Sequence, residues 1–182
     1  SYDYSEVEDE ARAAGVDAFI IKPLFRSRLA ATLKQVVSGK PDQSAKNYLR
    51  DIESSDYSDM RILLVEDNDL NREIASEIIG MTGAKVETAE NGKVAIDKIE
   101  ANPEEWYDLV FMDIQMPVMN GYETTAVIRT MDGKRGKLPI VAMTANAFAE
   151  DVQLAKNTGM NEHMAKPLDF NKLNSILREY LA

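Results

Sequence analysis

The chain has 182 residues, of which 45% are hydrophobic and 29% are charged, a composition typical of a globular protein with room for one well-buried domain and additional material. The net charge of -10 argues against direct nucleic-acid binding, and the absence of cysteine excludes disulfides, thiolate metal sites and cysteine nucleophiles. No apolar run approaches the roughly 20 residues of a membrane helix, so we expect no membrane contact by this segment and a cytoplasmic location, although a longer parent protein could be membrane-anchored elsewhere.

An internal repeat opens the chain. Residues 15–24 match residues 159–168 position by position, and both copies contain a lysine–proline step, Lys22-Pro23 and Lys166-Pro167. We therefore expect residues 1–37 to be the last part of a second copy of the domain that ends the chain, with a helix over 5–14, a strand over 18–21 and a helix over 27–37. Residues 38–59 are polar and turn-rich, which predicts a linker.

From residue 60 onward, short apolar runs alternate with amphipathic segments, a pattern typical of β-α units around a doubly wound parallel sheet with helices on both faces. The predicted strands are 62–65, 85–89, 109–112, 140–143 and 162–165, and the predicted helices are 71–82, 92–102, 122–131, 148–157 and 169–181. The fifth strand is more polar, which indicates a sheet edge. In the first helix, an apolar stripe predicts the face that packs on the sheet: Leu70, Ile74, Ile78 and Met81.

Three carboxylates are predicted at strand ends: Glu66 and Asp67 after the first strand, and Asp113 after the third. In an open parallel sheet, ligands bind beyond the carboxyl ends of the strands where the winding direction reverses, which lies between strands one and three if the order is 2-1-3-4-5. Crowded carboxylates repel one another unless a cation compensates them. An all-oxygen cluster suits Mg²⁺, with Mn²⁺ as a substitute, so we predict a magnesium site.

Two further polar residues are predicted at the same edge of the sheet, Thr144 after the fourth strand and Lys166 after the fifth. A lysine cation and a hydroxyl beside a metal-bound carboxylate form a pocket for a tetrahedral oxyanion. The anion would lie on Asp113. We also expect a cis Lys166-Pro167 peptide bond, because the lysine must turn back into the pocket and an X-Pro bond makes the cis form accessible.

Five motifs together resemble the receiver domain of response regulators. They occur in the family's order over residues 60–182 and are Leu63-Leu64-Val65-Glu66-Asp67-Asn68, Met112-Asp113-Ile114-Gln115-Met116-Pro117, Asn120-Gly121, Met143-Thr144-Ala145 and Lys166-Pro167-Leu168. The resemblance implies a flavodoxin-like α/β fold with strand order 2-1-3-4-5. It also implies a phosphoacceptor role in a two-component phosphorelay.

The resemblance assigns roles to the acidic residues. Asp113 would be the phosphoacceptor and Asp67 a direct Mg²⁺ ligand, with Glu66 acting largely through water. The backbone carbonyl of Gln115 would complete the protein ligands.

The remaining site residues would respond to the phosphoryl group. Thr144 and Lys166 would hold its oxygens, and Thr144 would act with His163 as a switch. His163 stands where the family often has an aromatic residue. It is the sole histidine of the chain and could suggest a phosphohistidine donor, but its place in a predicted strand favours a switch or packing role.

The resemblance extends to the first residues of the chain. Residues 1–37 resemble the last third of another receiver, so the chain resembles the tandem-receiver part of a hybrid sensor histidine kinase. The implied partner is a histidine kinase or a histidine phosphotransfer domain, and water would slowly remove the acyl phosphate. We expect residues 1–37 to dock on the complete receiver or on a second chain, which would give a homodimer, because exposed apolar surface costs about 25 cal/mol per Å².

Two other classes of function compete with this interpretation. A haloacid-dehalogenase-like phosphohydrolase would need a second acid two residues after its nucleophile, where Gln115 stands. An interaction module that only keeps the fold would not need the acidic trio together with Thr144 and Lys166. A soft-metal site at Met112, Met116, Met119 and Met143 is disfavoured, because methionine more often fills gaps and copper would also need histidine or cysteine.

Overall fold

The computed structural model describes residues 57–145 and 149–181. The predicted helix–strand–helix of residues 1–37 and residues 38–56 of the predicted linker lie outside these ranges, so both remain predictions. Tyr57, four residues before the first strand, is buried. None of the helices in the described ranges is long and apolar enough to cross a membrane.

One five-stranded sheet with entirely parallel pairing forms the centre of the domain, in the order β2-β1-β3-β4-β5. The strands are β1 (Arg61–Val65), β2 (Lys85–Ala89), β3 (Leu109–Asp113), β4 (Ile140–Thr144) and β5 (Glu162–Ala165). The strand order and the edge position of β5 confirm the sequence predictions. Asp113 and Thr144 are the last residues of their strands rather than the first residues after them.

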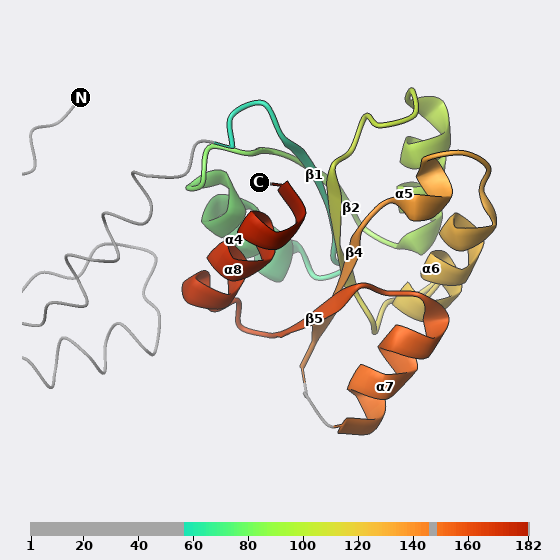
Figure 1. Ribbon diagram of the computed structural model, residues 1–182. Coiled ribbons are helices and arrows are strands. Elements are labelled where there is room, and N and C mark those ends of the chain that lie inside the picture. The colour runs from blue at the N-terminus through green and yellow to red at the C-terminus, as the bar shows by residue number, and fades with distance from the viewer. Residues whose placement is uncertain (1–56, 146–148, 182) are drawn as a thin grey trace, which may run out of the picture. The chain divides into compact units, whose positions relative to one another are not determined.

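A helix follows each strand, and the helices cover both faces of the sheet (Figure 1). They are α4 (Asp69–Gly80), α5 (Gly92–Ala101), α6 (Gly121–Thr130), α7 (Ala149–Thr158) and α8 (Phe170–Leu181), with a short 3-10 helix, η1 (Arg135–Lys137), before β4. Helices α4 and α8 lie on one face, and α5, α6 and α7 lie on the other. The domain is therefore a doubly wound, flavodoxin-like α/β fold.

Alternation along the strands produces two buried layers, because successive side chains point to opposite faces of a sheet. Leu63, Val110 and Ile140 pack with residues of α5, α6 and α7 in one apolar cluster. Their strand neighbours Ile62 and Phe111 point to the other face and are fully buried. Both faces of the central strands are thus covered, as their near-continuous apolar sequences predict.

Helix α4 packs on the sheet through a different face from the one that the sequence predicts. Its buried residues are Ala75, Ile78 and Ile79, whereas Leu70 is 65% exposed and Ile74 is 42% exposed. The predicted stripe was therefore wrong in the first two turns. The first two turns lie next to the carboxyl end of β1 and extend beyond the strands, whereas the later turns lie over the sheet.

Helix α4 also begins earlier than predicted. The side chain of Asn68 caps it by accepting a hydrogen bond from the backbone N–H of Asn71 at 3.0 Å. This cap places the first helical turn immediately after the acidic pair, Glu66 and Asp67.

Candidate functional site

The three predicted acids meet at the carboxyl edge of the sheet. Each of Glu66, Asp67 and Asp113 offers an oxygen atom within 4.8 Å of the others. Glu66 is 2% exposed and Asp113 is 5% exposed. They lie close together because β1 and β3 are adjacent parallel strands that end at the same level. The winding reversal between these strands leaves this corner open to a ligand.

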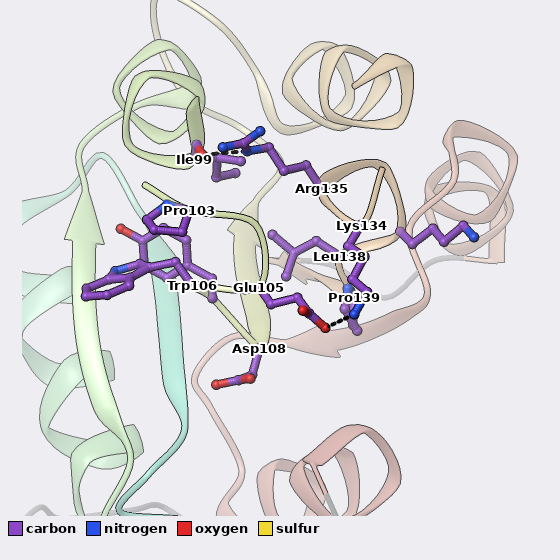
Figure 2. A pocket seen from close by; sticks show the side chains of 11 residues that line it. Ile99, Pro103, Glu105, Trp106, Asp108, Lys134, Arg135, Leu138 and Pro139 are labelled. Carbon is purple, nitrogen blue, oxygen red and sulfur yellow. Dashed lines mark hydrogen bonds and ion pairs between the residues drawn. The ribbon is translucent and has the colours of Figure 1, made fainter. Parts of the chain in front are cut away.

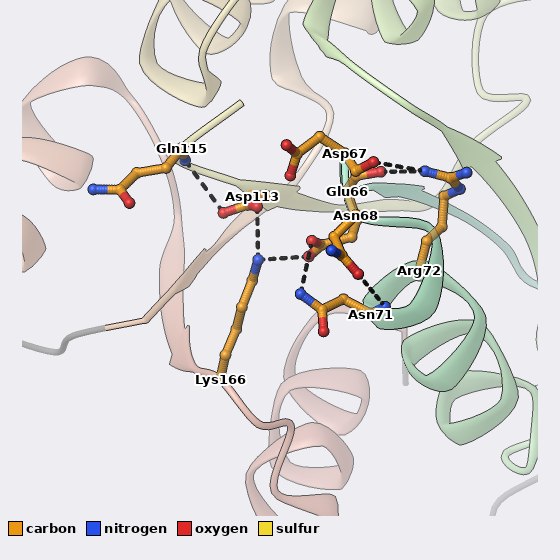
Figure 3. Close-up of polar contacts among 8 residues, drawn as sticks. All are labelled: Glu66, Asp67, Asn68, Asn71, Arg72, Asp113, Gln115 and Lys166. Atoms are coloured by element: carbon orange, nitrogen blue, oxygen red, sulfur yellow. Dashed lines mark hydrogen bonds and ion pairs between the residues drawn. The ribbon is translucent and has the colours of Figure 1, made fainter. Parts of the chain in front are cut away.

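Lys166, which follows β5, reaches back into this corner (Figure 3). Its Nζ lies 2.5 Å from Oε2 of Glu66 and 2.6 Å from Oδ2 of Asp113. Burial works against the charge of this ammonium group, but its hydrogen bonds to Asp113 and Glu66 outweigh burial and raise the pKa of Lys166. The Lys166-Pro167 peptide bond is cis, which confirms the sequence prediction.

The environment of Asp113 opposes its ionisation. Burial is the largest effect and raises the pKa of Asp113, and the nearby charge of Glu66 acts in the same direction. Hydrogen bonds from Lys166 and from the backbone N–H of Gln115, which lies 3.2 Å from Oδ1, only partly offset it. A further cation at this corner would therefore stabilise the ionised carboxylate.

A cavity of about 260 Å³ opens over these groups, and its lining includes Thr144, Ala145 and Asp151 beside the acids and Lys166. Thr144 is 5% exposed at the end of β4, so its position matches the sequence prediction. Asp151, from α7, adds a carboxylate that the sequence reasoning missed. The cavity thus combines carboxylates, a hydroxyl residue and an ammonium group in a space large enough for a tetrahedral anion.

His163 lies apart from this cavity. It pairs with Ala142 across the β4–β5 ladder, and its Nδ1 lies 3.1 Å from Oε1 of Glu162. The backbone N–H of His163 donates to the same oxygen at 2.8 Å. His163 does not line the acidic cavity, so any switch role would act through β5 rather than by contact with a ligand there.

Two residues in the first turn of α4 contact the acidic pair and were missed by the sequence reasoning. Nδ2 of Asn71 donates to Oε1 of Glu66 at 3.3 Å. Nη1 of Arg72 donates to the backbone carbonyls of Glu66 and Asp67 at 2.8 and 3.3 Å. Their positions five and six residues after Glu66, in a helix that begins directly after the pair, are the signal that could have identified them.

A larger cavity, of about 410 Å³, lies at the opposite end of the sheet and is lined by Trp106, Leu138 and Pro139 among others (Figure 2). Most of its charged groups already have partners, and Asp108 accepts a hydrogen bond from the backbone N–H of Arg61. Lys134 forms an ion pair with Glu105, and Arg135 donates to backbone carbonyls at the end of α5. The cavity therefore lacks a group of three neighbouring carboxylates like the one at the carboxyl edge.

The donor set at the carboxyl edge fits Mg²⁺. Within residues 57–145 and 149–181, the cluster that could hold a metal ion consists of the carboxylates of Glu66, Asp67 and Asp113, without histidine. Hard oxygen donors of this kind suit Mg²⁺ rather than softer metals. Asp67 is the most exposed of the three and leaves solvent access to the site.

Comparison with known proteins agrees with this geometry. A sequence model described as "Response regulator receiver domain" matches residues 62–178. Hybrid signal transduction histidine kinase M of Dictyostelium discoideum is 39% identical over 120 residues, which cover 65% of this chain and 5% of that kinase. The chain spans 5% of the length of this kinase and 19% of the length of probable histidine kinase 6 of Oryza sativa subsp. japonica, to which it is 29% identical over 191 residues.

Solved structures of receiver domains share the fold. The receiver domain of sensor histidine kinase PA1611 from Pseudomonas aeruginosa, solved with a magnesium ion in its active-site cleft, has a TM-score of 0.60 and 35% identity over 66% of this chain and 96% of that chain. The receiver domain of Ssk1 from Saccharomyces cerevisiae, in complex with the histidine phosphotransfer protein Ypd1, has a TM-score of 0.59 and 27% identity over 66% of this chain and 88% of that chain.

Proposed function

Since the chain belongs to the response regulator receiver domain family of two-component signalling, we propose that Asp113 accepts a phosphoryl group from a phosphohistidine. The observation that carries the proposal is the buried Asp113 carboxylate, which shares a cavity with Lys166, Thr144 and three further acids. This combination supports binding of a phosphoryl group and does not depend on the family alone.

The proposed step forms one bond and breaks another. A carboxylate oxygen of Asp113 attacks phosphorus in line with the leaving nitrogen, and the P–N bond breaks with its electron pair remaining on the imidazole. The product is an acyl phosphate. The ammonium group of Lys166 and the hydroxyl of Thr144 would each hold one phosphoryl oxygen.

The metal site would be formed by the residues already gathered at this corner. Asp67, Asp113 and the backbone carbonyl of Gln115 would hold Mg²⁺ directly, and Glu66 would hold it largely through water. The bound ion would supply charge neutralisation between the acids and the incoming anion. Mn²⁺ would be a substitute, because it also prefers oxygen ligands.

Exposed apolar side chains beside the site support docking of a protein donor. Leu70 and Ile74 lie one turn apart on α4, next to the cavity that Asn68 and Asn71 line. Such a pair suits an apolar surface on a histidine kinase or a histidine phosphotransfer domain. We propose that this donor covers Leu70 and Ile74 while its phosphohistidine reaches Asp113.

Phosphorylation would change the surface around β4 and β5. The new charge would draw Thr144 toward the phosphoryl group, and the adjacent strand carries His163 two residues before Ala165, the register partner of Thr144. Movement of Thr144 would then bias the position of His163. Water would later remove the acyl phosphate.

The chain would belong to a larger signalling protein. We propose that this protein is a cytoplasmic or membrane-anchored hybrid sensor histidine kinase, in which residues 1–37 are the end of a preceding receiver. Docking of residues 1–37 and a homodimer remain part of this proposal.

Labelling with acetyl phosphate tests the proposed function, with the phosphorylated fraction read from phosphate-affinity gels. The parent should become labelled with Mg²⁺ but not with excess chelator, whereas Asp113→Asn should remain unlabelled under both conditions. Equal labelling of the Asp113→Asn variant would show that another group accepts the phosphoryl group.

A further inference from the structure

We propose that Asn71 is a positioning residue that orients Glu66 for metal binding, an inference that rests on the proposed function. Both carboxylate oxygens of the buried Glu66 side chain are engaged. Oε2 lies 2.5 Å from Nζ of Lys166, and Oε1 accepts from Nδ2 of Asn71 at 3.3 Å. The orientation of this carboxylate is therefore determined from two sides (Figure 3).

The two side chains that donate hydrogen bonds to Glu66 differ in their other contacts. Lys166 also contacts Asp113 at 2.6 Å, and in the proposed reaction it turns toward the phosphoryl group. The amide of Asn71 has Glu66 as its partner and takes no part in that reaction. Asn71 is thus the donor that continues to hold Glu66 after Lys166 is recruited elsewhere.

The start of α4 fixes the position of Asn71 itself. Its backbone N–H donates to Oδ1 of Asn68 at 3.0 Å, which anchors the first turn. In the next position, Arg72 binds the backbone carbonyls of Glu66 and Asp67. The turn that carries the acidic pair is consequently tied to the same helical turn that carries the Asn71 amide.

From this arrangement we expect replacement of Asn71 to change the affinity for the metal ion rather than the stability of the fold. A partner that orients a metal-binding side chain typically contributes about 10-fold or more to affinity. Asn71 is exposed, and leucine has a similar size and a higher helix propensity than asparagine, so Asn71→Leu removes the donor without weakening α4. Asn171→Leu, at an exposed position in the first turn of α8, is the matched control.

Calorimetric titration with Mg²⁺ alone, combined with thermal unfolding without metal, tests the inference. We expect Asn71→Leu to weaken Mg²⁺ binding about 10-fold, to keep the parent's unfolding temperature and to recover most of the parent's acetyl phosphate labelling at saturating Mg²⁺. Asn171→Leu should match the parent in all three.

Two results would overturn the inference. One is a parent-like dissociation constant for Asn71→Leu, and the other is a weaker constant accompanied by a lower unfolding temperature, which would indicate a structural role. The proposed function is tested separately, because its failure would appear as absent labelling of the parent protein whatever the Mg²⁺ affinities.

Discussion

The ammonium group of Lys166 lies 2.6 Å from Oδ2 of Asp113, and the same nitrogen lies 2.5 Å from Glu66. Lys166 therefore acts as an internal cation for the acidic cluster. An incoming Mg²⁺ ion would share these carboxylates with a positive charge that is already present.

Replacement of this lysine should strengthen metal binding. A unit charge about 5 Å away at an effective dielectric constant of about 20 contributes roughly 3 kcal/mol, so after partial screening we expect Lys166→Met to bind Mg²⁺ about 10-fold more tightly. Asp67→Ala should bind it more weakly, because a ligand is lost. Calorimetry is the appropriate measurement, since Trp106 lies at the opposite end of the sheet from the acids. Weaker binding by Lys166→Met would contradict the role of internal cation.

The exposed pair Leu70 and Ile74 on α4 should affect phosphotransfer from protein donors but not from small-molecule donors. Leu70→Ser and Ile74→Ser should each slow phosphotransfer from a phosphorylated histidine phosphotransfer protein about 10-fold at low donor concentration, the effect of losing about 1.4 kcal/mol of docking energy. Labelling by acetyl phosphate should not change. Leu154→Ser on α7, where the side chain is 48% exposed, is the control. An equal loss with both types of donor would argue against a docking surface.

Much of the fold follows from patterns that the sequence displays openly. The run Leu109–Met112 is apolar throughout because both faces of β3 are covered, and the polar composition of Glu162–Ala165 matches its edge position. Strand ends also predicted the meeting of Asp113 with the acidic pair. In a parallel sheet, the chemistry-bearing edge can be derived from where each apolar run stops.

Contacts that depend on the exact phase of a helix were not predictable in the same way. Leu70 and Ile74 fit an apolar stripe by spacing, yet the packed face of α4 is centred on Ala75 and Ile78. The contact of Asn71 with Glu66 depends on the same phase, and only the Asn68 cap combined with the spacing from Glu66 indicates it. Spacing alone does not specify which side of a helix faces a strand end.

Arg129 is the centre of a hydrogen-bond network that no sequence motif indicated. Its guanidinium donates to the carbonyls of Gly136, Leu138 and Gly159 at 2.9 to 3.1 Å and to Oδ1 of Asn161 at 2.9 Å. Burial lowers the pKa of Arg129, but these acceptors tie α6 to the segments before β4 and β5.

Replacement of Arg129 should therefore destabilise the domain. Arg129→Lys keeps the charge but cannot reach all of these acceptors, so we expect a loss of about 2 to 4 kcal/mol in the free energy of unfolding. Urea denaturation measures it. Arg178→Lys, at an exposed position on α8, should change stability by less than about 0.5 kcal/mol, and equal losses for the two variants would refute the argument.

The contacts of the Glu87 carboxylate predict that the fold loses stability at low pH. Partial burial raises the pKa of Glu87, but hydrogen bonds from Tyr107 and Trp106 and the charge of Lys98 outweigh burial, so the pKa lies below its ordinary value of 4.5. A carboxyl with a lowered pKa in the folded state stabilises the fold above its unfolded pKa. That contribution disappears as the pH falls through the folded value.

Denaturation at several pH values tests this contribution. Glu87→Gln should cost about 1 kcal/mol at pH 7, because its NH2 group cannot accept one of the two hydrogen bonds that the indole of Trp106 and the phenol of Tyr107 donate to Glu87. The difference from the parent should shrink below about pH 4.5. Urea unfolding between pH 3 and pH 7, followed by circular dichroism, gives both values. A difference that stays constant or grows in acid would contradict the assignment.

Identification of the phosphorylated residue tests the central claim most directly. Borohydride reduces an aspartyl phosphate to homoserine, so peptide mass spectrometry after acetyl phosphate treatment reveals which carboxylate carried the phosphoryl group. We predict homoserine at position 113 in the parent protein with Mg²⁺ and none in the presence of chelator. Homoserine at Asp67 in place of Asp113, or conversion that does not depend on a divalent ion, would contradict the proposed chemistry.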